Sequence, residues 1–361
     1  MAYPLIILGA GASMDYLRAD DHIERRDNNY SRYKSPLMNQ LFDDQRFYEI
    51  LGRHREMGSF ASDVMNAMSR QNANFEEYLT NARDNLIKNN PAIYNQLISL
   101  IFYLSDLFSE VSLKYYYQQN HYKDLLQKID NYCNGQACIV NFNYDLLLER
   151  SLSEHLYGGF DISKVDDYIN KNVKIIKIHG ACNWRYNPQT VQNKATTAVN
   201  FFSQFSEKII TNGTKDQIYP VASDISNVNF NPEYIEGLQT WTVKLPAIAL
   251  PLKNKASNYV CSESHINVLK ESMKKADRVL VIGWRGADTF LLNLLKEELQ
   301  DKKVRATIVT INSKAEEMIK FYGEVVPQFV IDNNDVYVSG FSEFMKSDSY
   351  ENFFTRNEKI F

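Results

Sequence analysis

Five short, largely apolar runs in this chain each end at a glycine or a polar residue, and helical patterns separate them. They span residues 4–8, 137–140, 173–178, 278–283 and 305–311. Short apolar runs of this kind are typical of strands that are covered on both faces. Such strands alternating with helices are typical of a parallel, doubly wound sheet. The sequence therefore predicts an α/β fold built on a Rossmann-like, doubly wound parallel sheet.

The first apolar run leads into Gly9-Ala10-Gly11-Ala12-Ser13, which is typical of a phosphate-binding turn. Glycine adopts backbone angles that a Cβ forbids, and it lets a dinucleotide pyrophosphate come close to the main chain. The N-terminus of the following helix would offer unpaired amides to the phosphates. The full fingerprint has a third small residue two positions beyond the second glycine, and Ser13-Met14-Asp15 meets it only loosely. A tight strand-to-helix connection without any ligand remains an alternative.

Two long inserts interrupt the predicted sheet within one domain that spans residues 1–361. We expect a helical module at about 35–132, where apolar residues recur at helical spacing, and an irregular insert at about 185–244, where they do not. The charge-rich stretch 16–34 is expected to be a loop, and a helix is expected to begin at Ser35-Pro36. The Rossmann core then consists of three pieces, at about 1–15, 136–184 and 245–335.

The composition makes several classes of protein unexpected. Forty basic side chains against forty-four acidic ones give a net charge of −4, so direct nucleic-acid binding is not indicated. No apolar run approaches the roughly 20 residues that span a bilayer, and the N-terminus lacks a secretory pattern. We therefore expect a cytoplasmic protein without a membrane segment. The four cysteines form no Cys-x-x-Cys pair, so we expect reduced thiols, no zinc ribbon and no bound metal.

Polar residues collect where the predicted strands end. Asn143 and Asp145 follow one strand, His179 follows the next, and Gly283 and Asn312 follow two others. Ligands of open α/β sheets bind at the carboxyl edge of the strands, which is where these residues would meet. Each residue also has an ordinary explanation: Asn143 and Asp145 could cap a helix, a histidine after a strand is often structural, and Asn312 could form a turn.

Taken together, these motifs resemble the sirtuin family in order and spacing. They are Gly-Ala-Gly-Ala-Ser at 9–13, Asn-Tyr-Asp at 143–145, Ile-His-Gly at 178–180, Ile-Gly at 282–283 and Ile-Asn at 311–312. The chain is similar in particular to the bacterial sirtuin-like branch that is associated with antiphage defence, in which Asn-Tyr-Asp and Leu-His-Gly-x-x-x-Trp occur. His179 to Trp184 is similar to the second of these motifs.

The resemblance implies a role for each matching residue, with NAD⁺ as the substrate. Asp145 would hydrogen-bond the nicotinamide carboxamide, Asn143 would orient the attacking water, and His179 would be the general base near the nicotinamide ribose. The remaining motif residues would hold the rest of NAD⁺. Gly9, Ala10, Gly11, Ala12 and Ser13 would cradle the pyrophosphate, Gly283 and Trp284 would line the phosphate and ribose path, and Asn312 would contact the adenosine ribose.

Two departures from the family pattern favour water over acetyl-lysine as the acceptor. The cysteine pairs of the deacetylase zinc ribbon are absent, and Met14 to Arg18 replaces the Gly-Ile-Pro-Asp-Phe-Arg segment of deacetylating sirtuins. The expected function is therefore NAD⁺ glycohydrolysis by an antiphage effector, as a homo-oligomer, with a HerA-type hexameric ATPase as a partner known in the family. A deacylase, an ADP-ribosyltransferase and a non-catalytic NAD⁺ or ADP-ribose sensor remain alternatives.

Overall fold

A seven-stranded sheet lies at the centre of the computed structural model, which describes residues 2–18, 28–71, 75–86, 92–186, 218–220, 233–235, 240–242, 246–252, 259–311 and 315–355. The strand order is β11-β10-β9-β1-β2-β3, and β12 also pairs with β10. Every pair in this sheet is parallel. The strands are β1 (Pro4–Leu8), β2 (Ala137–Asn141), β3 (Val173–Ile176), β9 (Arg278–Ile282), β10 (Val304–Val309), β11 (Phe329–Val330) and β12 (Val336–Tyr337).

The order of the strands confirms the predicted doubly wound sheet. Numbered by their sequence along the chain, the six strands of the main path have the Rossmann order 3-2-1-4-5-6. From β1 the chain winds outward through β2 to β3, and it then returns to the other side of β1 to form β9. The order therefore reverses between β1 and β9, and this switch point is where such sheets bind ligands.

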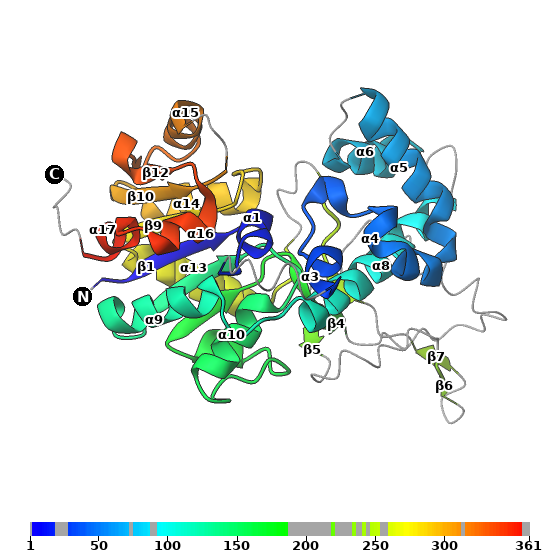
Figure 1. Cartoon of the computed structure of the whole chain (residues 1–361), viewed down its shortest axis with the longest axis horizontal. Coiled ribbons are helices and arrows are strands. Elements are labelled where there is room, and N and C mark those ends of the chain that lie inside the picture. The colour runs from blue at the N-terminus through cyan, green and yellow to red at the C-terminus, as the bar shows by residue number, and fades with distance from the viewer. Residues whose placement is uncertain are drawn as a thin grey trace.

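Helices flank the sheet, and the central strands are buried along their whole length. Every residue of β1, β2 and β9 is buried, which explains why their sequences lack an alternating polar face. The helices α9, α16 and α17 contact one another in front of the sheet, whereas α13 and α14 contact each other behind it (Figure 1). The flanking helices are α1 (Ala10–Met14), α9 (His121–Cys133), α10 (Leu147–His155), α11 (Asp167–Asn170), α13 (Glu263–Lys275), α14 (Thr289–Leu299), α15 (Ala315–Val325), α16 (Gly340–Lys346) and α17 (Ser349–Thr355).

A helical module lies beside the sheet (Figure 1); most of it falls in the predicted stretch 35–132, but it begins earlier, with α3. Its longest helix, α8, contains the segment Gln96–Lys114, which is long and apolar enough to cross a membrane, but 72% of its apolar window is buried inside the protein. This helix packs against β4 and β8, so we interpret it as a core helix. The module contains α3 (Asn28–Tyr33), η1 (Met38–Gln40), α4 (Asp44–Arg53), η2 (Arg55–Met57), α5 (Gly58–Gln71), α6 (Phe75–Asn81), η3 (Ala82–Leu86) and α8 (Ala92–Lys114).

Two local predictions near the start of this module are wrong. Part of the expected loop 16–34 is the helix α3. The helix expected at Ser35-Pro36 is only the short 3-10 turn η1, and α4 begins after Asp43, whose side chain accepts a hydrogen bond from the Arg46 amide. The Ser35 hydroxyl does not cap a helix, because it donates to the Asp145 carboxylate.

The chain leaves the sheet after β3 earlier than the apolar run 173–178 predicts. β3 ends at Ile176, and a turn at Gly180, with a φ of +78°, starts the antiparallel strand β4 (Gly180–Tyr186). A Cβ at Gly180 would lie 1.8 Å from the Ala247 carbonyl oxygen, so only glycine fits there. β4 pairs with β5 (Ile218–Pro220) and β8 (Pro246–Ile248), and β6 (Glu233–Ile235) pairs with β7 (Thr240–Thr242).

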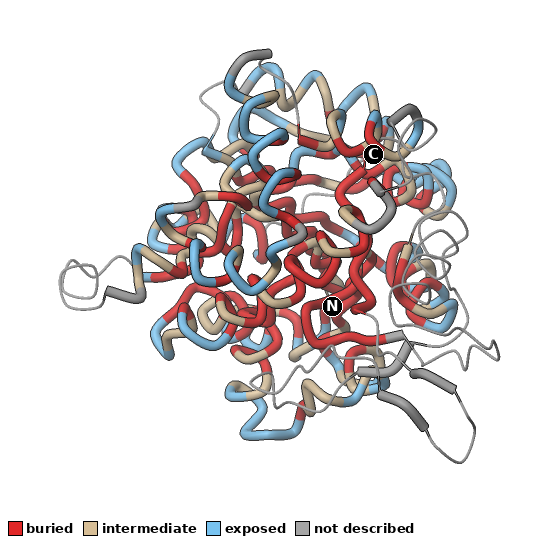
Figure 2. Tube along the Cα trace, turned by 90° about the vertical axis from the view of Figure 1, so that its right-hand side faces the viewer, coloured by how far each residue is buried: buried red, intermediate tan, exposed pale blue. Residues whose placement is uncertain are grey.

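The buried residues form one continuous core that joins the sheet to the helical module. Figure 2 shows buried chain running through the centre of the trace, with exposed residues on the outer helices. The helix α8 packs on β4, which follows β3 in the chain, and on β8, which comes before β9. The carboxyl edge of the sheet therefore faces the junction with that module. Side chains from the module therefore reach the ends of β1 and β2.

Candidate active site

Three glycines bring the ends of β1 and β9 together at the switch point. A Cβ at Gly9 would lie 2.4 Å from the Gly283 carbonyl oxygen, and a Cβ at Gly11 would lie 2.9 Å from the Gly283 Cα. Gly283 itself has a φ of +61°, and its Cβ would lie 2.5 Å from the Ala12 amide nitrogen. These glycines are therefore required for the close approach of two protein backbones, whether or not a ligand binds.

The glycine turn offers fewer unpaired amides than its sequence suggests. The Gly9 amide donates to Ile282 O at 2.9 Å, the Gly11 amide to Gly283 O at 3.3 Å and the Ala12 amide to Gly9 O at 2.9 Å. The Ala10 amide stands at the first position of α1, where no carbonyl of the helix can accept its hydrogen bond. A bound pyrophosphate would need further donors from side chains near the turn.

A buried network of polar side chains surrounds Ser13 at the end of this turn. The Ser13 hydroxyl donates to Asp145 Oδ1 at 3.1 Å and accepts from Asn143 Nδ2 at 2.9 Å. The Tyr122 hydroxyl lies 2.9 Å from Ser13 Oγ, and it must donate, because the single Ser13 proton faces the carboxylate. Asn143 Nδ2 also donates to Gly9 O at 3.1 Å. This second bond fixes the orientation of the Asn143 amide, since a carbonyl oxygen can only accept.

The carboxylate of Asp145 is enclosed by hydrogen-bond donors from three segments. Asp145 is 1% exposed, and besides Ser13 it accepts from the Ser35 hydroxyl at 3.2 Å and from the Leu147 amide at 3.2 Å. Burial raises the pKa of Asp145 above its ordinary value, and the charge of Lys177 and these hydrogen bonds offset only part of that increase. The carboxylate thus holds Ser13, and through it Asn143, in a fixed place.

We expect Asp145→Asn to remove a pH dependence of stability. A carboxyl group whose pKa is raised by folding stabilises the protein fully below its unfolded pKa of about 4, and this contribution is lost as the pH rises through the folded pKa. The free energy of unfolding of the wild type, measured relative to Asp145→Asn by urea denaturation, should therefore decrease as the pH rises from acid to neutral. A difference that grows with pH would show that the network stabilises the ionised carboxylate.

His179 and Asp288 form a hydrogen-bonded pair across the same edge of the sheet. His179 Nε2 lies 2.8 Å from Asp288 Oδ2, while Asp288 Oδ1 accepts from the Leu291 amide at 2.8 Å and so caps α14. Because an ionised carboxylate only accepts, Nε2 donates in this contact, and in the neutral imidazole Nδ1 is then the nitrogen without a hydrogen. The pair has the arrangement of a general base with an orienting carboxylate.

Aromatic rings connect the histidine with the end of β9. The Phe142 ring stacks on Trp284 with centroids 5.3 Å apart and an angle of 4° between the planes, and it meets the His179 ring edge-on at 5.0 Å. The Trp284 carbonyl oxygen accepts from the Tyr322 hydroxyl at 2.8 Å. Since Phe142 directly precedes Asn143, this stack places His179 next to the strand end that carries the polar network.

The structure brings together most of the residues that the sequence singles out. Gly9, Ala10, Gly11, Ala12, Ser13, Asn143, Asp145 and Gly283 belong to one contact network, and Phe142 joins it to His179 and Trp284. Asn312 lies outside the described residues. The functions of these side chains stay predictions, because their positions fit both a ligand site and a packed sheet edge.

Four residues of this site were not predicted as functional. Asp288 caps α14, and it also binds His179. Ser35 comes from the helical module and Tyr122 from α9, and no local pattern marks either as functional. Asp288 and Phe142 each come shortly after a strand that ends at this edge of the sheet. This position was the one sequence feature that could have pointed to them.

Potential metal ligands do not cluster in the part of the chain that the structure describes. There, no three histidine, cysteine, aspartate or glutamate side chains gather so that they could hold a metal ion. All four cysteines are buried and form no disulfide. The described side chains of the site carry imidazole, carboxylate, amide and hydroxyl groups.

Comparison with known proteins gives only distant structural similarity. No protein-family model matches the chain, and no curated protein matches it. Among solved structures, a triple mutant of a Sir2 homologue in complex with 2′-O-acetyl ADP-ribose has a TM-score of 0.40 at 9% identity, covering 99% of this chain and 95% of that one. A complex of a Sir2 homologue with NAD has a TM-score of 0.39 at 9% identity, covering 97% and 88%. Sir2 bound to an acetylated peptide has a TM-score of 0.39 at 13% identity, covering 98% and 94%.

Proposed function

We propose that this chain is a sirtuin-like NAD⁺ glycohydrolase that cleaves NAD⁺ to nicotinamide and ADP-ribose. The observation that carries this proposal is the His179–Asp288 pair beside the glycine turn at the switch point of a Rossmann-ordered sheet. The motif series resembling sirtuins supports it, since the members that the structure describes, among them Gly9, Asn143 and His179, lie at that edge. The TM-scores given above are too low to add support, so we rely on the motifs and on the geometry.

The reaction that we propose requires positioning more than strong acid catalysis. Cleavage of the bond between ribose C1′ and the nicotinamide nitrogen develops oxocarbenium character on the ribose, and nicotinamide leaves as a neutral molecule. The water oxygen then bonds to C1′ and a proton is lost. We propose that His179 Nδ1 accepts this proton, while the Asp288 contact at Nε2 holds the imidazole in place.

The polar network would place the water and the nicotinamide ribose. Both hydrogens of the Asn143 amide already have acceptors, Gly9 O and Ser13 Oγ, so Oδ1 is the atom left to hold a water molecule. An amide holds water without competing with it as a nucleophile. Both Asp145 oxygens already accept hydrogen bonds, so we propose that this carboxylate acts mainly by holding Ser13. The Asp145 carboxylate could contact the nicotinamide carboxamide only through the lone pairs that these hydrogen bonds leave unused.

Incubation of the purified protein with NAD⁺ tests the proposed activity. Released nicotinamide and ADP-ribose are measured with and without an acetylated peptide. Release without any peptide supports the glycohydrolase, whereas release that requires the peptide supports a deacylase, and transfer of ADP-ribose to protein supports a transferase. NAD⁺ binding without release, in the presence and absence of a partner, supports the sensor.

Asn143→Ala should lower the rate of nicotinamide release by about 10²-fold, the size of effect expected when a reacting group loses its position. Asn131→Ala, at an exposed site on α9, removes the same amide far from the sheet edge and should leave the rate unchanged. Thermal unfolding of both variants checks that the fold is intact. Wild-type cleavage by a folded Asn143→Ala protein would contradict the role of Asn143 in holding water.

We further propose, from the resemblance alone, that the enzyme acts in bacterial antiphage defence by depleting NAD⁺. The homo-oligomer and the HerA-type hexameric ATPase partner are parts of this proposal. Measuring the mass of the purified protein in solution, and its NAD⁺ cleavage with and without the ATPase and DNA, tests them. A monomer whose activity the ATPase does not change would contradict both.

A further inference from the structure

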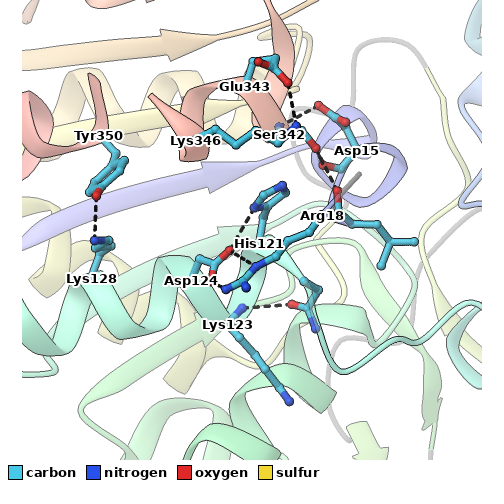
Figure 3. A network of polar contacts seen from close by, with 12 residues as sticks. Asp15, Arg18, His121, Lys123, Asp124, Lys128, Ser342, Glu343, Lys346 and Tyr350 are labelled. Atoms are coloured by element: carbon cyan, nitrogen blue, oxygen red, sulfur yellow. Dashed lines mark hydrogen bonds and ion pairs between the residues drawn. The ribbon is translucent and has the colours of Figure 1, made fainter. Parts of the chain in front are cut away.

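A cavity rich in hydrogen-bond donors lies away from the candidate active site, between the segment that follows α1, helix α9 and the C-terminal helices (Figure 3). It has a volume of about 380 Å³. Its walls include three basic side chains and one acidic one. They are Arg18, Lys128 and Lys346 against Asp124, with Met345 and Tyr350 beside them. The wall residues thus carry an excess of positive charge, although Glu343, which pairs with Lys346, lies beside them and the chain as a whole carries a net charge of −4.

The basic side chains keep donors for a ligand after their contacts within the protein are counted. Arg18 Nε donates to Asp124 Oδ2 at 2.9 Å and Nη2 also binds this carboxylate, which leaves the two hydrogens of Nη1 and one of Nη2. Lys128 Nζ donates to the Tyr350 hydroxyl at 2.8 Å, and Lys346 Nζ pairs with Glu343 at 2.9 Å. Each ammonium group has three hydrogens, so two remain on each lysine.

The single acidic wall residue is already neutralised. Asp124 accepts from Arg18 and also lies 3.1 Å from Nδ1 of His121, which is 2% exposed. Its carboxylate is therefore occupied, and the three cationic side chains belong to the lining of the same cavity. An anion with several oxygen acceptors matches this arrangement, because charge-assisted hydrogen bonds to phosphate are among the strong ones.

The volume indicates more than a bare phosphate. Small-molecule pockets begin at about 300 Å³, and the apolar Met345 and the Tyr350 ring give this cavity a wall that a phosphate group alone would not contact. We propose that the cavity binds a small organic phosphate, such as a nucleoside monophosphate. Its phosphate lies among Arg18, Lys128 and Lys346, and its apolar body lies against Met345 and Tyr350.

The cavity wall is joined to the segment that follows the glycine turn. The Ser342 amide donates to Asp15 Oδ2 at 3.0 Å, and the Ser342 hydroxyl donates to the carbonyls of Asp15 and Leu17. The His121 amide donates to Tyr16 O at 2.6 Å. Residues 15–18 are thus held between α9 and α16, so the position of Arg18 is fixed before a ligand binds.

Titration calorimetry with AMP, inorganic phosphate and adenosine tests the proposal. The wild type should bind AMP, bind inorganic phosphate more weakly and not bind adenosine. Lys128→Gln and Lys346→Gln should each weaken AMP binding about tenfold or more, the effect of one lost hydrogen bond to a charged group. Lys164→Gln, at an exposed lysine paired only with Asp161, is the matched control and should bind AMP like the wild type.

The variants also separate this cavity from the candidate active site. AMP binding that stays unchanged in both Lys128→Gln and Lys346→Gln places AMP elsewhere and overturns the proposal, as does the absence of binding by AMP and phosphate. Unfolding curves of the two variants show whether a loss of binding reflects a loss of fold. The two substitutions lie on different helices, so a common loss of AMP binding in folded proteins supports the site.

Discussion

His179→Ala and Asp288→Asn should each lower the rate of nicotinamide release by about 10²–10⁴-fold. The first change removes the proposed base. The second acts through the histidine tautomer, because the new side-chain oxygen would keep the bond to the Leu291 amide while the new NH₂ group would turn a donor toward His179 Nε2. Nε2 would then have to accept, the proton would move to Nδ1, and the lone pair that we assign to the reaction would be lost.

Two controls separate this effect from damage to the fold. Asparagine caps a helix as well as aspartate, so Asp288→Asn should unfold at the wild-type temperature. Asp43→Asn changes the cap of α4, where no histidine is bound, and should leave the rate unchanged. His155 binds Asp130 in a similar pair far from the sheet edge, so His155→Ala is the control for His179→Ala. A wild-type rate and pH profile for Asp288→Asn would show that Asp288 is only a cap.

Lys177→Met should lower the free energy of unfolding by about 3–5 kcal/mol, because it breaks a fully buried ion pair. Lys177 Nζ lies 2.8 Å from Glu149 Oε1, and both side chains are 0% exposed. Lys177 also donates to the Asp145 carbonyl oxygen at 2.7 Å. Burial already raises the pKa of Glu149, and without the lysine this carboxyl group would lose the charge that opposes that increase.

A second substitution tests whether the buried charge causes the loss. The double variant Lys177→Met/Glu149→Leu removes both charges and should recover most of the stability, since apolar replacements of a buried pair are often nearly neutral. Lys174→Met, on the same strand, is the control: its ammonium group binds only backbone carbonyls and is partly exposed, so a much smaller loss is expected. Equal losses in the single and double variants, measured by urea denaturation, would contradict this explanation.

The sheet was predictable because its strands are buried on both faces. Residues 4–8 and 278–282 are apolar throughout or nearly so, and that pattern belongs to a covered parallel strand. The end of β3 was not predictable from this pattern. Ile178 is as buried as a strand residue, but its carbonyl oxygen accepts from the Val260 amide rather than from a neighbouring strand of the sheet. At Ile178, therefore, an apolar and buried residue is not part of the sheet, and the apolar pattern alone cannot show where the strand ends.

The candidate site was predictable only where a residue follows a strand. Asn143, Asp145 and His179 could be placed at one edge because parallel strands end together. The partners that fix them come from elsewhere: Tyr122 reaches Ser13 from α9, and Ser35 reaches Asp145 from the helical module. Ser35 also shows why its own helix start was mispredicted, since a distant carboxylate takes the hydroxyl that a local helix would have used as a cap.

The contact between Gly283 and the first glycine turn also limits what a glycine motif can reveal. Gly9 and Gly11 have to be glycine because another backbone lies where their Cβ atoms would be. A relative without the NAD⁺ cleavage that we propose here would keep the same glycine spacing as long as it kept the sheet. The His179 imidazole is not required for this close approach of two backbones. An inactive relative would therefore differ first at such side chains.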